Sequence, residues 1–150
     1  MTDNVDPATR SRMMAGIKSK DTKPEVFLRK ALHAQGLRYK LGGGGLPGRP
    51  DLVFPSRQTV VFVHGCFWHM HECRYFKWPG SNQTFWRQKL GGNADRDKRV
   101  KGELTKLGWR VLTVWECELR ETGYSLPNSA VNRVARLLFV RGQLGALHQQ

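Results

Sequence analysis

The stretch RPDLVFPSRQTVVFVHG, residues 49–65, has the pattern of two short β-strands joined by a turn. Residues 51–54 and 59–64 are rich in Val and Phe, which favour extended backbone, and the PSRQ between them is typical of a turn. Two apolar runs separated by so few residues predict a hairpin at the centre of the fold.

Helical patterns surround this hairpin. Thr22 and Glu25 are spaced as a capping box, which predicts a helix that begins there and ends near Gly36. The sequence WRVLTVW predicts a further strand over residues 109–115. Because helices and strands are interleaved, we expect a mixed α/β domain with a small central sheet flanked by helices. The other predicted helices cover residues 7–18, 84–107, with Gly91 and Gly92 as a weak spot, and 128–140.

The length and the charge of the chain narrow its class. The 150 residues suffice for a single domain over 1–150, with a basic N-terminal arm over 1–20 and a C-terminal helical segment over 121–150 that carries no motif. The chain has 25 Lys and Arg against 12 Asp and Glu, a formal net charge of +13. This excess predicts a polyanionic partner, with nucleic acid as the first candidate. A basic protein that is merely soluble is the alternative.

Neither export nor membrane insertion is predicted. The opening MTDNVDPATR lacks the apolar region of a signal peptide, and the most apolar run, TVVFVHGCFW, is far shorter than the ~20 residues of a membrane span. We therefore expect a cytoplasmic protein. Metal ligation suits its three cysteines better than disulfides, because an odd number cannot all pair.

The segment HGCFWHMHEC, residues 64–73, is crowded with metal-binding side chains. Its two cysteines, together with Cys117 and one histidine, complete a closed Cys3His zinc site. His69 and His71 both precede Cys73 by an even number of residues, so in extended backbone either of them points toward that thiol. Spacing leaves the choice open. The alternative is that the cysteines are small buried hydrophobic residues.

An aspartate that opens a hairpin is also the outline of a common nuclease core, in which it holds Mg²⁺ against a phosphate. Asp51 occupies that place, and Glu25 stands where a glutamate from an earlier helix often joins the site. The second strand of that core usually carries an acidic residue and a lysine, whereas VFVHG has neither. Helix capping for Glu25 and a turn position for Asp51 are the alternatives.

Five blocks of the sequence together resemble the very short patch repair (Vsr) DNA mismatch endonucleases, in order over about residues 7–120. The resemblance implies a variant of the PD-(D/E)xK nuclease fold, which is the restriction-endonuclease-like fold, with a structural zinc site. It also implies an Mg²⁺-dependent endonuclease that nicks one strand 5′ to the thymine of a T·G mismatch, the product of 5-methylcytosine deamination. The blocks are ATRSRMM, LPGRPDLVF, HGCFWHMHEC, FWRQKLGGNADRDKR and LGWRVLTVWECEL.

The resemblance implies a role for each candidate side chain. Asp51 is expected to be the metal-binding catalytic aspartate, His69 the general base and Asp97 its orienting carboxylate. His64 is expected to be a second active-site histidine, and Glu25 a glutamate near the metals. Histidine suits a base at neutral pH because its pKa is ordinarily about 6.5. The expected zinc ligands are Cys66, His71, Cys73 and Cys117.

Position 63 departs from the family pattern, in which we expect threonine, because this chain has Val63. If the backbone carbonyl alone binds Mg²⁺, valine is harmless, whereas a required hydroxyl would weaken metal binding. We expect the carbonyl of Val63 to be the ligand.

The resemblance also implies an aromatic wedge that enters the base stack at the mismatch, formed by Phe67, Trp68 and Trp86. One stacked ring is worth ~1–3 kcal/mol per base, which is comparable with the cost of unstacking a step. A mismatch lowers the cost of unstacking, so the wedge enters mismatched DNA more easily than matched DNA. Packing in a core is the alternative for these rings.

Two further elements are expected to contact DNA. Lys89 and Asn93 share one face of the predicted 84–107 helix with Trp86 and Asp97, so they are candidates for reading the mismatched pair. Met14, on the basic N-terminal helix, is a candidate apolar wedge for the minor groove. The alternative for that helix is packing on the body of the protein.

Two other functions compete with mismatch nicking. A zinc-stabilised DNA-binding protein without cleavage has no need of Asp51 and His69, and a restriction-type enzyme that cuts matched duplex has no use for an aromatic wedge. We therefore predict a nicking endonuclease that acts as a monomer on duplex DNA with a T·G mismatch. Repair-pathway proteins are possible further partners, and the expected location is the bacterial cytoplasm, on the nucleoid when DNA is bound.

Overall fold

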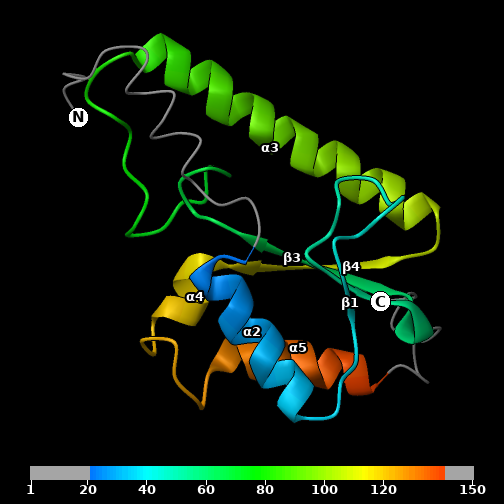
Figure 1. Cartoon of the computed structure of the whole chain (residues 1–150). Helices are drawn as coiled ribbons and strands as arrows, with labels where there is room; N and C mark the ends of the chain where they lie inside the picture. Colours follow the sequence, from blue (N-terminus) through cyan, green and yellow to red (C-terminus); the bar gives the residue numbers. More distant parts are fainter. Residues whose placement is uncertain (1–20, 141–150) are drawn as a thin grey trace.

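The centre of the protein is a four-stranded sheet. The computed structural model describes residues 21–140. The strands are β1 (Lys40–Leu41), β2 (Leu52–Phe54), β3 (Thr59–His64) and β4 (Arg110–Trp115), side by side in that order. β1 pairs antiparallel with β2 and β2 with β3, whereas β3 and β4 are parallel. Parallel neighbours need a crossover, and the chain between them forms a long helix over the sheet (Figure 1).

Helices cover both faces of this sheet (Figure 1). α2 and α5 lie together on one face, and α3, the longest helix, lies on the other. α4 follows β4 without an intervening loop. The bounds are α2 Lys23–Ala34, α3 Gln83–Lys106, α4 Glu116–Arg120 and α5 Ser129–Phe139, and a 3-10 turn, Pro55–Arg57, joins β2 to β3.

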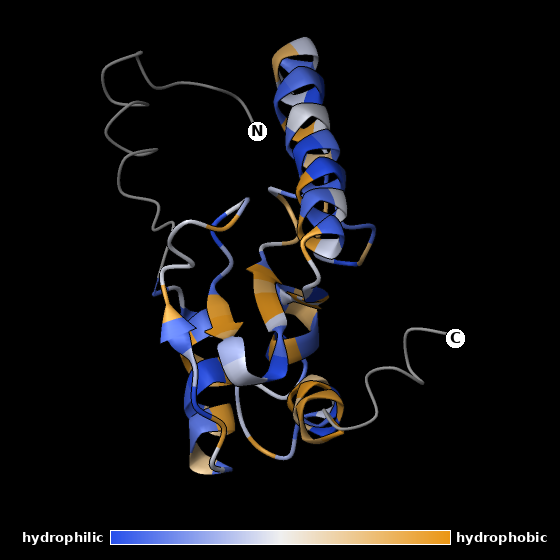
Figure 2. Ribbon diagram, turned by 90° about the vertical axis from the view of Figure 1, so that its right-hand side faces the viewer, coloured by the Kyte–Doolittle hydropathy of each residue, from blue (hydrophilic) through white to orange (hydrophobic). Residues whose placement is uncertain are grey.

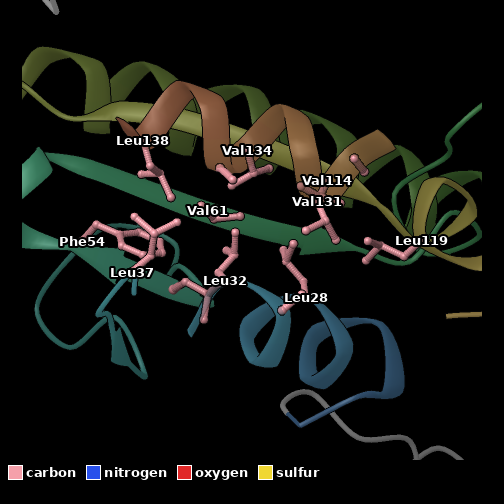
Figure 3. Packing of buried hydrophobic residues seen from close by; sticks show 14 residues of the cluster. Leu28, Leu32, Leu37, Phe54, Val61, Val114, Leu119, Val131, Val134 and Leu138 are labelled. Atoms are coloured by element: carbon pink, nitrogen blue, oxygen red, sulfur yellow. The ribbon is translucent and has the colours of Figure 1, made fainter. Parts of the chain in front are cut away.

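The larger core lies between the sheet and the layer of α2 and α5 (Figure 3). Alternate residues of the strands point into it, as expected for a sheet that buries both faces. Full burial of a Val, Leu or Phe side chain is worth roughly 1.5–3 kcal/mol, so this cluster is the main stabilising contact of the domain. Its fully buried side chains include Leu28, Leu32, Leu52, Phe54, Val61, Val114, Leu119, Val131 and Leu138.

A smaller core lies on the other face of the sheet, against α3. To it α3 contributes only residues of its C-terminal half. The N-terminal half has one buried side chain, Leu90, and rises clear of the sheet (Figure 2). That half is thus free to contact the loop that precedes it. The smaller core consists of Val53, Val60, Phe62, Val100 and Leu104.

The register of the parallel strands fixes where the loops meet. Val63 lies opposite Val114, and His64 lies opposite Trp115, so β3 and β4 end level with each other. The loop after β3 and the short α4 after β4 therefore leave the sheet at the same edge. Residues 65–82 contain no helix or strand.

The predicted mixed α/β domain is confirmed, with a small mixed sheet flanked by helices. The hairpin, the third predicted strand and three predicted helices are present within a few residues of their expected bounds. α3 continues through Gly91 and Gly92 without a break, and β1 and α4 were not predicted. The predicted helix over 7–18, with Met14, lies outside the described residues. Between residues 21 and 140 no helix is both long and apolar enough to cross a membrane.

Candidate active site and metal-ligand cluster

Four side chains with metal-binding atoms meet at the edge where β3 and β4 end. Cys66 follows β3, Cys117 lies in α4, and the loop before α3 brings His71 and Cys73 to them. Their ligand atoms all lie within 4.8 Å of one another, and Cys117 Sγ is 3.7 Å from His71 Nδ1. Three thiols and one imidazole at this spacing fit a tetrahedral zinc ion with no open position.

Tight turns after β3 decide which histidine joins this cluster. The His69 N–H donates to the Gly65 carbonyl at 3.3 Å, and the His71 N–H donates to the Cys66 carbonyl at 2.9 Å. Met70 between them has a left-handed backbone, with φ of 52°. Because the chain is not extended here, the two imidazoles point to different groups. His71 lies beside the thiols, and His69 lies in a second group.

The surroundings of the three thiols shift their pKa values in different directions. Burial raises the pKa of Cys66 to about 12, and burial likewise raises the pKa of Cys117. At Cys73 burial is outweighed by hydrogen bonds, from the backbone of Tyr75 first, and the pKa is lowered. Without a metal the buried thiols stay protonated. A metal bound by these residues would have to displace those protons, because cysteine ligates metals as the thiolate.

The second group consists of His64, His69 and Asp97. His69 Nδ1 and Asp97 Oδ2 are 2.6 Å apart. The rings of His64 and His69 are stacked, with centroids 3.8 Å apart and planes within 4°. Burial, and then the charge of His69, lowers the pKa of His64 to about 4, against an opposing effect of Asp97. These three residues could themselves hold a metal, since their ligand atoms also lie within 4.8 Å of one another.

Trp115 contacts both groups. Its indole is stacked on His71, with centroids 4.0 Å apart and planes within 6°. His64 meets the same indole edge to face, with centroids 5.3 Å apart. Both groups are therefore in contact with the same aromatic ring. A cavity of about 300 Å³ between α3 and the sheet adjoins Trp115, His64 and Asp97.

Asp51 lies just before β2 and is anchored by the neighbouring strand. Its Oδ2 accepts the Val63 N–H at 2.7 Å. Burial raises the pKa of Asp51 to about 7, the Val63 bond opposes this, and the charge of Glu25 adds to it. Glu25 is 4% exposed and accepts a hydrogen bond from Arg29 at 2.7 Å. Glu25 also has its predicted place in the helix cap, because the Thr22 hydroxyl accepts its N–H at 3.4 Å.

The three predicted wedge rings form a half-exposed cluster outside both cores. Phe67 lies 5.1 Å from Trp68 and 5.4 Å from Trp86, between centroids. Asn93 donates from Nδ2 to the Trp68 carbonyl at 3.0 Å, which ties the cluster to α3. Lys89, on the same helix, is exposed. Rings that served only as packing would sit in one of the two cores, so their position disfavours that alternative.

Sequence patterns did not single out Trp115 or Arg29. Trp115 was assigned only to a strand, and its contact with both histidine groups follows from the parallel register of β3 and β4. That register is a tertiary property and leaves no local signal. Arg29 stands four residues after Glu25, a spacing that brings opposite charges together on a helix. That signal was present in the sequence.

Comparison with known proteins identifies close relatives. Residues 2–75 match the family model described as DNA mismatch endonuclease Vsr. The chain is 48% identical to the DNA mismatch endonuclease Vsr of Escherichia coli over 120 residues, which is 80% of this chain and 77% of that protein. It is 47% identical to the Type II nicking enzyme V.XorIIP of Xanthomonas oryzae pv. oryzae over 82% of this chain and 90% of that protein. With V.NmeAIP of Neisseria meningitidis it shares 43% identity over 91% and 96% of the two chains.

The raised pKa of Asp51 predicts a pH-dependent cost in stability. Because the folded-state pKa of about 7 lies above the ordinary 3.8, the folded protein holds this proton more tightly than the unfolded chain does. Stability is therefore lost as pH rises from about 4 to 7. Asp51→Asn keeps an acceptor for Val63 and removes the charge, so without Mg²⁺ it should melt several degrees above wild type at pH 8 and near wild type at pH 4. Thermal melts across this range measure the difference.

Asp95→Asn is the matched control, since Asp95 is an exposed carboxylate on α3. It should shift the melting temperature by the same small amount at every pH. If the melting temperatures of Asp51→Asn and wild type differed by the same amount at every pH, the charge of Asp51 would not destabilise the fold.

Proposed function

The chain belongs to the family of Vsr DNA mismatch endonucleases, and from this membership we propose that it nicks one strand of duplex DNA 5′ to the thymine of a T·G mismatch. Endonuclease action on mismatched DNA is the activity for which its relatives are named. The observation that carries the proposal is the inner face of α3. This face joins Trp86 of the aromatic cluster to Asp97 of the histidine–carboxylate pair, and Asn93 between them holds Trp68.

His69 is the proposed general base that takes a proton from the attacking water. An ionised carboxylate can only accept hydrogen bonds, so Asp97 accepts one from the Nδ1–H of His69. The free lone pair of the ring is then on Nε2. His64 is uncharged at neutral pH, since its pKa is lowered to about 4. It therefore stacks on His69 without repelling a proton that arrives there. General base catalysis of this kind contributes typically 10²–10⁴-fold to a rate.

Asp51, Glu25 and the Val63 carbonyl are the proposed Mg²⁺ ligands. The donor set fits, because the pKa of Asp51 is raised to about 7 by burial and by the neighbouring charge of Glu25, and a bound divalent cation would neutralise such a pair of carboxylates. When bound, Mg²⁺ stabilises the charge that develops on the cleaved phosphate. Val63 holds one Asp51 oxygen through its N–H and packs its side chain against the larger core. These contacts support the proposal that Val63 takes part through its backbone and not through its side chain.

The zinc is proposed to be structural. Cys66, His71, Cys73 and Cys117 leave no position for water, and thiolates suit Zn²⁺ whereas carboxylates suit Mg²⁺. A zinc ion there would tie the loop that follows β3, and with it His69, to α4. The two metals are thereby kept at separate sites.

We further assign the fold to the PD-(D/E)xK nucleases as a variant. Asp51 at the start of β2, the antiparallel β2–β3 pair and Glu25 on α2 support this assignment. His64 stands at the end of β3, near where that fold usually carries an acidic residue and a lysine. In this variant the histidines take over the role of that missing pair.

Recognition of the mismatch is assigned to the aromatic cluster and α3. Phe67, Trp68 and Trp86 are half-exposed, so they can stack on bases that a mismatch leaves easier to separate. Asn93 retains a second amide donor and its carbonyl acceptor beyond the bond to Trp68. Lys89 and Asn93 are the proposed readers of the pair, and Met14 stays a prediction outside the described residues.

Replacement of a zinc ligand should unfold the edge of the sheet. Cys117→Ser is expected to lose zinc and to lower the melting temperature, because metal binding is coupled to folding. Zinc content by mass spectrometry and a melting curve on the same sample measure both effects. A variant that keeps full zinc and wild-type stability would remove Cys117 from the ligand set.

Loss of either catalytic group should abolish nicking and spare binding. Asp51→Ala and His69→Ala act on the phosphate and not on the base stack, so mobility-shift affinity for T·G duplex should stay within a few-fold of wild type. A supercoiled or labelled T·G substrate reports the nick. His33→Ala is the matched control, because His33 is an exposed histidine on α2. Nicking at full rate by either variant would contradict the proposed mechanism.

The mismatch proposal is tested by comparing T·G with matched T·A duplex. Wild type should nick T·G far more, and Trp68→Ala should narrow the difference, because loss of one stacked ring at ~1–3 kcal/mol weakens engagement roughly 5- to 150-fold. Phe139→Ala, an aromatic truncation on α5 where Phe139 is 55% exposed, should change neither rate. Equal nicking of the two duplexes by wild type would favour a restriction-type enzyme.

A further inference from the structure

The loop between Cys73 and α3 carries two contacts between arginine and an aromatic ring. The Arg87 guanidinium carbon lies 4.5 Å from the centre of the Trp78 ring. The Tyr75 ring is flanked by Arg120 at 4.5 Å and by Arg74 at 4.9 Å. Arg74 also donates to the Tyr75 hydroxyl at 2.7 Å. Three guanidinium groups are thus held in place by two rings.

The positive charges of these three arginines are available to a partner from outside the chain. All three side chains are exposed, and none of the ion pairs found within residues 21–140 uses them. Stacking on a ring fixes the plane of a guanidinium and leaves its N–H donors at the edge. That edge matches the oxygens of a phosphate group, which arginine binds in a bidentate manner. Such a group points to an anion from outside the chain.

The two contacts continue the aromatic cluster of the proposed wedge. Phe76 lies 6.1 Å from Phe67 in a stacked arrangement and 5.2 Å from Trp78, between centroids. Arg87 follows Trp86 directly on α3, and the Gln83 amide donates to the Pro79 carbonyl at 2.9 Å, which holds the loop against the helix start. The loop runs from the end of the sheet to the beginning of α3 (Figure 1). A duplex engaged by the wedge would pass along it.

We propose that Arg87 on Trp78, and Arg74 with Arg120 on Tyr75, are phosphate clamps that grip the DNA backbone beside the mismatch. This inference rests on the proposed function, because it takes the aromatic cluster as the part that enters the base stack. The clamps contact no base edge. They therefore strengthen binding to matched and mismatched duplex alike, and they orient the duplex so that the wedge meets the base step.

The salt dependence of binding separates a phosphate contact from a packing role. Each phosphate neutralised adds about 0.9 to the slope of log affinity against log salt concentration. Arg87→Ala should lower that slope by about 0.9. Between 1 M and 0.15 M salt a slope difference of this size amounts to roughly 5-fold in affinity, so binding near 0.15 M salt should be weaker by about that factor. The loss should be equal for T·G and T·A duplex. Fluorescence anisotropy with the full-length, zinc-loaded protein measures it.

Trp78 is expected to act through Arg87. Trp78→Ala should weaken binding in wild type but add nothing in the Arg87→Ala background, whereas Trp78→Phe should keep the slope. Arg136→Ala is the control, because Arg136 is an exposed arginine on α5, on the opposite face of the sheet (Figure 1). It removes the same charge and should leave the slope unchanged. Unchanged melting temperatures rule out unfolding as the cause of any loss.

A wild-type slope for Arg87→Ala overturns the clamp at Trp78, and a wild-type slope for the Arg74→Ala, Arg120→Ala double variant overturns the clamp at Tyr75. A loss confined to the T·G duplex also overturns the proposal, because it would make Arg87 a reader of the base pair. Failure of wild type to nick T·G duplex is a separate result. It contradicts the proposed function and leaves the salt slopes to be measured on their own.

Discussion

The parallel pairing of β3 with β4 is the constraint on which the rest of the site depends. It places His64 opposite Trp115, so that both strands end at one edge of the sheet. The loop with Cys66, His71 and Cys73 leaves from one strand end, and Cys117 follows the other. A shift of one residue in this register would turn the side chains of β4 to the opposite face. Trp115 would then leave the histidines, and Val114 would leave the larger core.

The same edge keeps two chemically similar ligand groups apart. Cys66, Cys73 and Cys117 gather around His71, whereas His69 contacts Asp97 and stacks on His64. α3 makes this separation possible. Its C-terminal half packs on the sheet, while the side chains along its inner face reach the loop through hydrogen bonds to His69 and the Trp68 carbonyl. Under the proposed function, the structural metal site and the catalytic pair thus lie next to each other and share no residue.

Much of this arrangement could be predicted from the sequence, because it rests on local patterns. The runs of β-branched residues predicted the hairpin, and the capping box predicted α2. The choice between His69 and His71 could not be made from spacing, since both lie at even distances from Cys73. The even-distance rule holds only for extended backbone, and the left-handed Met70 breaks it. β1 was not predicted because two residues are too few to show alternation. α4 was not predicted because it begins directly after β4, with no loop between them to mark its start.

The central claim is that the ligands at this edge are divided between a structural metal and a catalytic pair. Zinc K-edge X-ray absorption on the wild-type protein and on His69→Ala tests it directly. We expect one zinc per chain with three sulfur neighbours and one nitrogen neighbour, at about 2.3 Å and 2.0–2.1 Å, and the same spectrum for both proteins. A first shell dominated by nitrogen and oxygen, or a zinc that is lost with His69, would contradict the division and place the metal between the two stacked histidines.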